Sequence, residues 1–190
     1  MSIESESALE ELLSRPYAED VEALGALEGD LLVLGVAGKM GPSLALRAAR
    51  ASEQAGRRRR IIGVSRFSNP EVRRRLEKGG IETISFDLLD FDRLRELPEA
   101  DNVVYMAARK FGSTGDEALT WAMNTLLAAR VAERWPRSRI VAFSSGNVYP
   151  LVPVAGGGAT EETPPGPIGE YAQSVLGRER LFEYFSRRRQ

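Results

Sequence analysis

From residue 30 onward, short runs of aliphatic and β-branched residues alternate with longer stretches whose apolar residues recur at helical spacing. The short runs carry few polar residues, as is typical of strands that a parallel sheet buries on both faces. Strands are predicted at residues 31–35, 60–65, 82–86, 102–107 and 139–144. Helices are predicted at residues 42–55, 71–78, 116–135 and 170–187. This alternation predicts parallel βαβ units.

Right-handed crossovers, with a switch after the third strand, give the strand order 3-2-1-4-5. We therefore expect an α/β fold of the Rossmann type, a doubly wound parallel sheet in three α/β/α layers. The 190 residues, 43% of them hydrophobic, suffice for one well-packed domain. Residues 1–29 predict an extension of two short helices, at 7–14 and 17–27, before a dinucleotide-binding domain at 30–190. Residues 150–169 hold five prolines and predict a long loop, which is often an active-site lid.

The chain contains no cysteine and no histidine. Disulfides, thiolate nucleophiles, Ser-His-Asp triads and metal sites built on these residues are therefore excluded, and we expect no metal. Any acid/base chemistry must use tyrosine, serine, threonine, carboxylates or the cofactor itself. The only lysines are Lys39, Lys78 and Lys110.

The charge balance indicates neither a nucleic-acid nor a membrane partner. The formal net charge is −1, and the arginine runs at 57–60, 73–75 and 187–189 are interpreted as solvated faces. No stretch is long and apolar enough to span a membrane, and the acidic N-terminus does not resemble a signal peptide. We expect a cytoplasmic protein that acts on a small molecule.

The sequence GVAGKMG at residues 35–41 lies between the first predicted strand and the first helix of the domain. A G-x-x-G-x-x-G spacing in that context predicts a dinucleotide site, because glycine allows the tight turn, the approach of the pyrophosphate and close helix packing. The start of the helix offers N–H groups to the phosphates. A Walker A motif is excluded, since Met40 stands where serine or threonine is required. The predicted contacts are Gly35, Gly38, Lys39, Met40 and Gly41.

Ser65 ends the second predicted strand and Arg66 follows it, 24 and 25 residues after Gly41. An acidic residue near this place binds the ribose hydroxyls of NAD, whereas an arginine accommodates the 2′-phosphate of NADP. The pair therefore favours NADP(H), with NAD(H) as the alternative. Arg66 can also be an ordinary surface arginine at a strand end.

Five further segments follow in order along the chain. They are Asp87-Leu88, Met106-Ala107-Ala108, Asn124, FSSGNVY at 143–149 and YAQS at 171–174. Together with the glycine loop they resemble the extended short-chain dehydrogenase/reductase family, within it the NAD-dependent epimerase/dehydratase group. The resemblance runs from about Leu31 to Phe185.

The resemblance implies a role for each matched position. Ser145 and Tyr171 would be the catalytic pair, in which Tyr171 acts as acid and base and Ser145 orients the substrate hydroxyl or carbonyl. The other matched positions would be Asp87 and Leu88 at the adenine edge, Ala107 and Ala108 beside the nicotinamide ribose, and Asn124 as a structural asparagine. A capping serine and a packing tyrosine are the alternatives for the catalytic pair.

The chain departs from the family pattern in two places. Val175 replaces the lysine of Y-x-x-x-K, which in the family binds the nicotinamide ribose and lowers the pKa of the tyrosine. The C-terminal region that forms most of the family's substrate pocket does not follow. Arg178, seven residues after Tyr171, lies about 10 Å further along the helix, too far for direct contact. Lys110, counted among the cofactor contacts, or Arg109 can supply the cation; a solvated loop cation is the alternative.

Three functions stay open at this stage. The first is an NAD(P)-dependent epimerase, dehydratase or reductase that acts on a nucleotide sugar or related polyol. The second is a catalytically impaired module that binds or senses NADP(H), and the third is an inactive fragment of a longer enzyme. A homodimer through helices 116–135 and 170–187 is one interpretation of their apolar residues, because family members often pair these helices. Burial of the same residues against the sheet is the alternative.

Overall fold

A computed structural model describes residues 3–112 and 114–188, which divide into two compact units. The first, here the sheet unit, comprises Met1–Leu88, Glu96–Met106 and Arg137–Val141. The second, here the helix unit, comprises Leu89–Arg95, Ala107–Pro136 and Ala142–Gln190.

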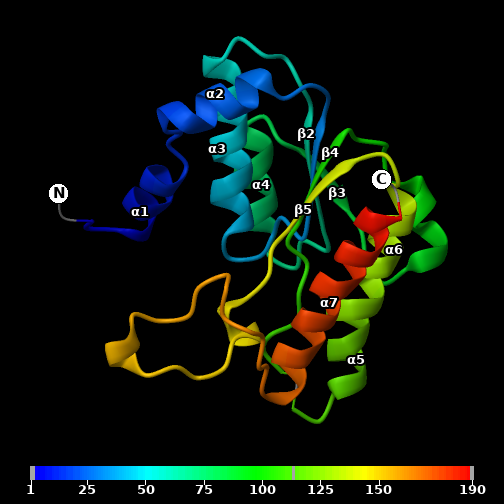
Figure 1. Ribbon diagram of the computed structural model, residues 1–190. Coiled ribbons are helices and arrows are strands. Elements are labelled where there is room, and N and C mark those ends of the chain that lie inside the picture. Colours follow the sequence, from blue (N-terminus) through cyan, green and yellow to red (C-terminus); the bar gives the residue numbers. More distant parts are fainter. Residues whose placement is uncertain (1–2, 113, 189–190) are drawn as a thin grey trace. The chain divides into compact units, whose positions relative to one another are not determined.

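A five-stranded sheet forms the centre of the sheet unit (Figure 1). Its strands are β1 (Leu31–Leu34), β2 (Ile61–Ser65), β3 (Glu82–Ser85), β4 (Asn102–Tyr105) and β5 (Arg139–Ala142). Their order is β3-β2-β1-β4-β5, and β1 pairs in parallel with both β2 and β4. The predicted α/β fold and strand order are therefore confirmed. Each strand is one or two residues shorter than predicted.

The central strand β1 explains why the sheet forms here. All four of its residues are buried, and Leu34 is opposite Val64 on one side and Tyr105 on the other. A strand between two neighbours has both faces and both edges covered, so an uninterrupted apolar run is stable only there. The glycine turn therefore starts from the end of a strand that is paired on both sides.

Four helices belong to the sheet unit. They are α1 (Glu6–Leu13), α2 (Ala18–Ala26), α3 (Gly41–Gln54) and α4 (Pro70–Lys78). The first two lie within residues 1–29, where two short helices were predicted. Helix α3 buries Ala45, Ala48 and Ala51, whose small side chains allow close approach. Helix α4 begins after Asn69, whose side chain accepts a hydrogen bond from the Glu71 N–H at 2.9 Å.

The helix unit contains α5 (Glu117–Trp121), a π-helical segment η2 (Ala122–Leu126), α6 (Leu127–Arg134) and α7 (Gly169–Arg187). A single helix was expected over 116–135, and the π-helical turn at its centre is a feature that helical periodicity did not predict. The short 3-10 helices are η1 (Phe91–Glu96), η3 (Gly146–Val148) and η4 (Val154–Gly156). Apart from η4 and the first residue of α7, residues 150–169 lack regular structure, as predicted. Within the described part of the chain, no helix is both long and apolar enough to cross a bilayer.

Candidate functional site

The glycine loop makes a tight turn directly after β1. The N–H groups of Gly35 and Val36 both donate to the carbonyl of Val64, at 2.9 and 3.3 Å, which fastens the turn to β2. The backbone of Gly35 has φ +87°, a left-handed conformation that favours glycine. The Gly38 N–H donates to the Gly35 carbonyl at 3.1 Å, and the Gly41 N–H donates to that of Gly38 at 3.2 Å. Two successive turns thus lead from strand to helix.

Gly41, at the start of α3, cannot carry a side chain. A Cβ atom there would lie 2.1 Å from the carbonyl oxygen of Val36, which is backbone and cannot move aside. Gly63 on β2 makes similar room, because a Cβ there would lie 2.8 Å from the Val36 side chain. Sequence reasoning missed Gly63, for which the only signal is a glycine inside an apolar strand. These two glycines let helix and strand pack close to the turn.

The predicted ribose and adenine contacts follow β2 and β3. Arg66 and Asp87 are exposed, whereas Leu88 is buried. The Phe86 N–H donates to the Ser65 carbonyl at 2.9 Å, so the segment that carries Asp87 begins beside Ser65. Phe67 has φ +49°, an uncommon conformation for a bulky residue. The structure therefore brings the ends of β2 and β3 together, and the cofactor contacts predicted there stay predictions.

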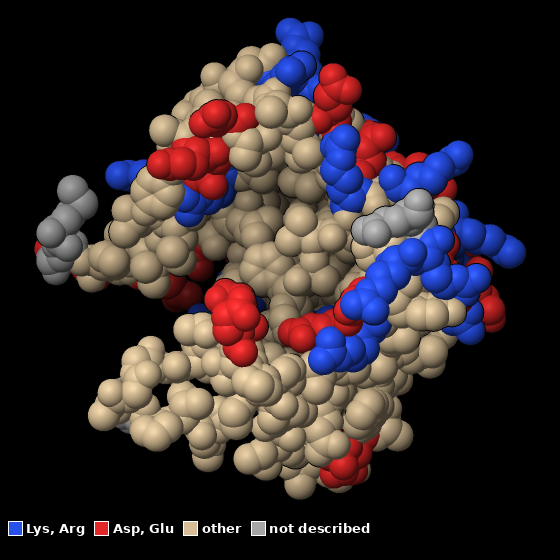
Figure 2. All heavy atoms as spheres, in the orientation of Figure 1, with Lys and Arg blue, Asp and Glu red and all other residues tan. Residues whose placement is uncertain are grey.

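The sheet unit also contains a large groove. A groove of about 1370 Å³ runs along α1, α2, α3 and strands β1, β4 and β5, with Lys39 and Met40 among its lining residues. Figure 2 shows mainly uncharged side chains on the floor of the groove. Leu24, Leu44 and Val103 contribute to its apolar lining. No sequence motif predicted this groove.

In the helix unit, a cation lies beside the predicted catalytic tyrosine. The ammonium of Lys110 is 5.7 Å from the centre of the Tyr171 ring and 5.8 Å from that of Phe111. Attraction between an ammonium and an aromatic face is expected at such distances. Val175, at the position of the family's lysine, is fully buried. Lys110 therefore lies near Tyr171, and its role as a substitute cation stays a prediction.

Ser145 lies at the start of η3 and caps it. Its hydroxyl accepts a hydrogen bond from the Asn147 N–H at 3.2 Å and donates to the Asn147 Oδ1 at 3.1 Å. Asn147 and Tyr171 both line a small pocket of about 280 Å³, together with Glu117. Hydrogen bonds from the N–H of Gly115, and then from its own N–H, hold the pKa of Glu117 below the usual range. The pocket therefore contains a phenol, an amide and a carboxylate.

A buried polar network underlies this pocket. Asn124, on η2, is fully buried, and its Oδ1 accepts from the Arg109 N–H at 2.8 Å and from Arg178 Nη2 at 3.1 Å. Its Nδ2 donates to the Arg109 carbonyl at 3.0 Å and to Ser174 Oγ at 2.9 Å. Sequence reasoning assigned Asn124 a structural role but gave Arg178 none.

Ala107 is buried and Ala108 exposed, both in the helix unit. Their predicted contact with a nicotinamide ribose stays a prediction. Among the described residues, no cluster of acidic side chains could hold a metal ion.

The comparisons with known proteins place this geometry in a fold. No family model and no curated protein matches the chain. Among solved structures, the enzyme WbmG of Bordetella bronchiseptica, in complex with NAD and UDP, superposes with a TM-score of 0.64 at 21% identity, over 83% of this chain and 50% of that one. The chain therefore has the same fold as the matched part of that enzyme.

Two epimerases superpose equally well. The UDP-Glc/GlcNAc 4-epimerase of Campylobacter jejuni gives a TM-score of 0.66 at 20% identity, over 84% of this chain and 49% of that one. The UDP-glucuronic acid 4-epimerase of Bacillus cereus, in complex with NAD, gives 0.65 at 20%, over 83% and 52%. The chain thus spans about half the length of the structures it matches.

Proposed function

We propose that this chain is the dinucleotide-binding part of a nucleotide-sugar epimerase, dehydratase or related reductase of the short-chain dehydrogenase/reductase family. Residues 30–190 form the dinucleotide-binding domain, and the segment 35–41 holds the pyrophosphate of NAD(H) or NADP(H). The observation that carries the proposal is the turn at Gly41, where a side chain would strike the backbone of Val36. Only a glycine permits this close approach of helix to strand.

The residues of the turn fit such a cofactor. Gly35, Gly38 and Gly41 leave the backbone bare, and α3 begins there with Pro42 at its first turn. A helix start of this kind attracts phosphate through its N–H groups and its dipole. Lys39 is exposed in the same loop and adds a positive charge. Both features favour an anionic ligand over a neutral one.

A nicotinamide cofactor held by this chain would supply the hydride transfer of the proposed reaction. Tyr171 takes the proton from the substrate hydroxyl or gives it back, and Ser145 orients that oxygen by a hydrogen bond. Lys110 supplies the positive charge beside the Tyr171 ring that the family obtains from the lysine of Y-x-x-x-K. The contact at 5.7 Å supports this role for Lys110.

Cofactor binding is tested by titrating the chain with NADH and NADPH and following nicotinamide fluorescence. Gly38→Ala should weaken binding about tenfold or more, because its Cβ, 3.3 Å from the Gly35 carbonyl, crowds the loop. Gly25→Ala is the matched control, since a Cβ there meets the Cβ of Ala55 at the same 3.3 Å but lies on α2. Equal affinity of both variants and the wild type would contradict the proposed site.

The choice between NADPH and NADH depends on Arg66. We propose a preference for NADPH, since Ser65-Arg66 provides a cation and no carboxylate at the end of β2. The alternative is a preference for NADH, because the two similar structures described above are in complex with NAD. Arg66→Ala should lower the affinity for NADPH while sparing that for NADH. A wild-type chain that binds NADH more tightly would favour the alternative.

Catalysis is tested by the change in nicotinamide absorbance with a panel of nucleotide sugars. Lys110→Ala should reduce turnover, and Lys78→Ala, an exposed lysine on α4, should leave it unchanged. The second candidate function is a module that binds the dinucleotide without catalysis, and the buried Val175 in place of lysine favours it. Tight cofactor binding without turnover of any sugar would support this second candidate.

A further inference from the structure

Arg178 is a buried cation that no part of the proposed reaction uses. It lies on α7, one turn after Val175, and only 3% of its surface is exposed. Removing a guanidinium from water is unfavourable, so a buried one persists only where its donors find acceptors in good geometry. Its position therefore calls for a structural explanation.

The donors of Arg178 reach two segments outside its own helix. Its Nη1 donates to the carbonyl of Phe143 at 2.8 Å, and its Nε donates to the carbonyl of Asn124 at 3.2 Å. Its Nη2 donates to the Asn124 side chain at 3.1 Å. Guanidinium is planar and presents its donors as a rigid fork, so it fixes both acceptors relative to α7.

Each acceptor leads to a residue of the proposed catalytic set. Phe143 precedes Ser144-Ser145 by one and two residues. Asn124 binds both backbone groups of Arg109, the neighbour of Lys110, at 2.8 and 3.0 Å. Asn124 also donates to Ser174 Oγ, which in turn donates to the carbonyl of Tyr171 at 2.8 Å. One guanidinium thus connects the segments that carry the serine, the lysine and the tyrosine.

The π-helical turn supports this connection. Asn124 lies within η2, and π-helical turns occur often at functional sites. The turn displaces Asn124 from the spacing of a regular α-helix. Here it brings one asparagine within reach of Arg109, Ser174 and Arg178 together.

We propose that Arg178 is a positioning residue. Together with Asn124, it sets the places of Lys110 and Ser145 about Tyr171, in a chain whose Y-x-x-x-K lysine is replaced by Val175. Arg178 touches none of the reacting groups and acts through the backbone of Phe143 and Arg109. The inference rests on the proposed function for its consequence in catalysis, but its geometric part can be tested without turnover.

The geometric part is tested by amide hydrogen exchange in the whole chain. Arg178→Met, which keeps an unbranched side chain of similar reach, should speed exchange of the Arg109 amide about tenfold, because Asn124 loses the partner that fixes its acceptor oxygen. Arg180→Met on the same helix breaks only an exposed ion pair with Glu183 and should change nothing there. An Arg109 amide that exchanges at the wild-type rate in Arg178→Met would overturn the proposal.

Two additions make the test robust. If Arg178→Met does not fold, Arg178→Lys replaces it: a single ammonium cannot reach all three acceptors, so exchange at Arg109 should again accelerate. If the wild type turns over a sugar, Arg178→Met should lower kcat about a hundredfold with little change in KM, as misplaced catalytic groups do. A change in KM alone would overturn the positioning role. Absence of turnover in the wild type would count against the proposed function only.

Discussion

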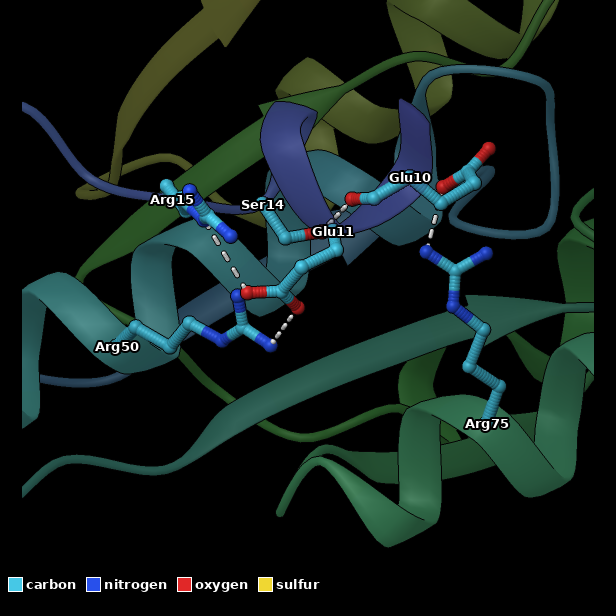
Figure 3. Close-up of polar contacts among 6 residues, drawn as sticks. All are labelled: Glu10, Glu11, Ser14, Arg15, Arg50 and Arg75. Carbon is cyan, nitrogen blue, oxygen red and sulfur yellow. Dashed lines mark hydrogen bonds and ion pairs between the residues drawn. The ribbon is translucent and has the colours of Figure 1, made fainter. Parts of the chain in front are cut away.

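Arginine side chains join neighbouring segments in two regions of the chain, and the arginines of the two regions differ in burial. In the helix unit, the buried Arg178 donates to neutral oxygens of Asn124 and Phe143. In the sheet unit, α1 is tied to its neighbours by ion pairs at the surface, Glu10 with Arg75 at 2.5 Å and Glu11 with Arg50 at 2.8 Å (Figure 3). The hydrogen bonds of Arg178 set the relative positions of three segments. The ion pairs of α1 hold a helix that buries none of its residues.

Burial decides what such a contact is worth. Surface ion pairs are screened by water and salt and must order two long side chains, so they contribute little. Water cannot replace a lost acceptor of a buried guanidinium. Each lost acceptor therefore makes the buried charge less favourable. Arginine content alone therefore says nothing of stability. The same residue type makes buried hydrogen bonds in one unit and more exposed ion pairs in the other.

The largest expected effect comes from removing the acceptor and leaving the charge. Asn124→Leu keeps the approximate volume of the side chain but removes the side-chain amide that bonds Arg178 Nη2, Ser174 Oγ and the Arg109 N–H. We expect a loss of about 3 to 5 kcal/mol in the free energy of unfolding, measured by denaturant titration. Gln173→Leu, an exposed position on α7, is the control. A loss equal to that of the control would show that the network does not stabilise the unit.

Removing the charge itself should cost less. Arg178→Met leaves three oxygens without this donor but no buried cation, so we expect a loss of about 2 kcal/mol in the same titration. The informative result is which of the two variants, Asn124→Leu or Arg178→Met, loses more stability. If Arg178→Met is more damaging than Asn124→Leu, packing around the guanidinium rather than its charge dominates, and the contrast between the two regions is weaker than we propose.

Much of the fold could be predicted from the sequence, because the signals for it are local. The apolar runs located every strand, and the strand–glycine–helix context located the turn at Gly35 and Gly41. The strand ends were overestimated, as at Ala107 and Ser144, because apolar or small residues continue past the last ladder hydrogen bond. A composition signal marks where a strand can be, but pairing decides where it ends.

The helix unit was less predictable because its decisive contacts join distant residues. Helical spacing placed Arg178 about 10 Å from Tyr171 and so excluded direct contact. It could not show that Arg178 turns to Asn124, 54 residues away in the chain. The π-helical turn that brings Asn124 within reach of Arg178 cannot be predicted from the spacing of apolar residues. The roles of Ser145, Tyr171 and Lys110, together with the pairing of helices 116–135 and 170–187 into a dimer, stay predictions.

A smaller effect is expected at α1. Glu11→Gln should change the overall free energy of unfolding very little, since its ion pair with Arg50 is exposed. The amides of α1 should nevertheless exchange faster, and salt at about 1 M should produce the same acceleration in the wild type by screening. The Arg109 amide in the helix unit should respond to neither. Salt that accelerates Arg109 as much as α1 would remove the distinction between the regions.

The smallest effect concerns pH and again separates the regions. A hydrogen bond from Arg50, opposed in part by desolvation, holds the pKa of Glu11 below the usual glutamate range. Because the folded value is lower than the unfolded one, the stabilisation is complete above the unfolded value of about 4.3 and disappears as pH falls through the folded value. Exchange in α1, corrected for its intrinsic pH dependence, should therefore accelerate between about pH 5 and pH 3. Glu11→Gln should lack most of this response, while the Arg178–Asn124 contact, which has no group that titrates in this range, should keep Arg109 protected throughout.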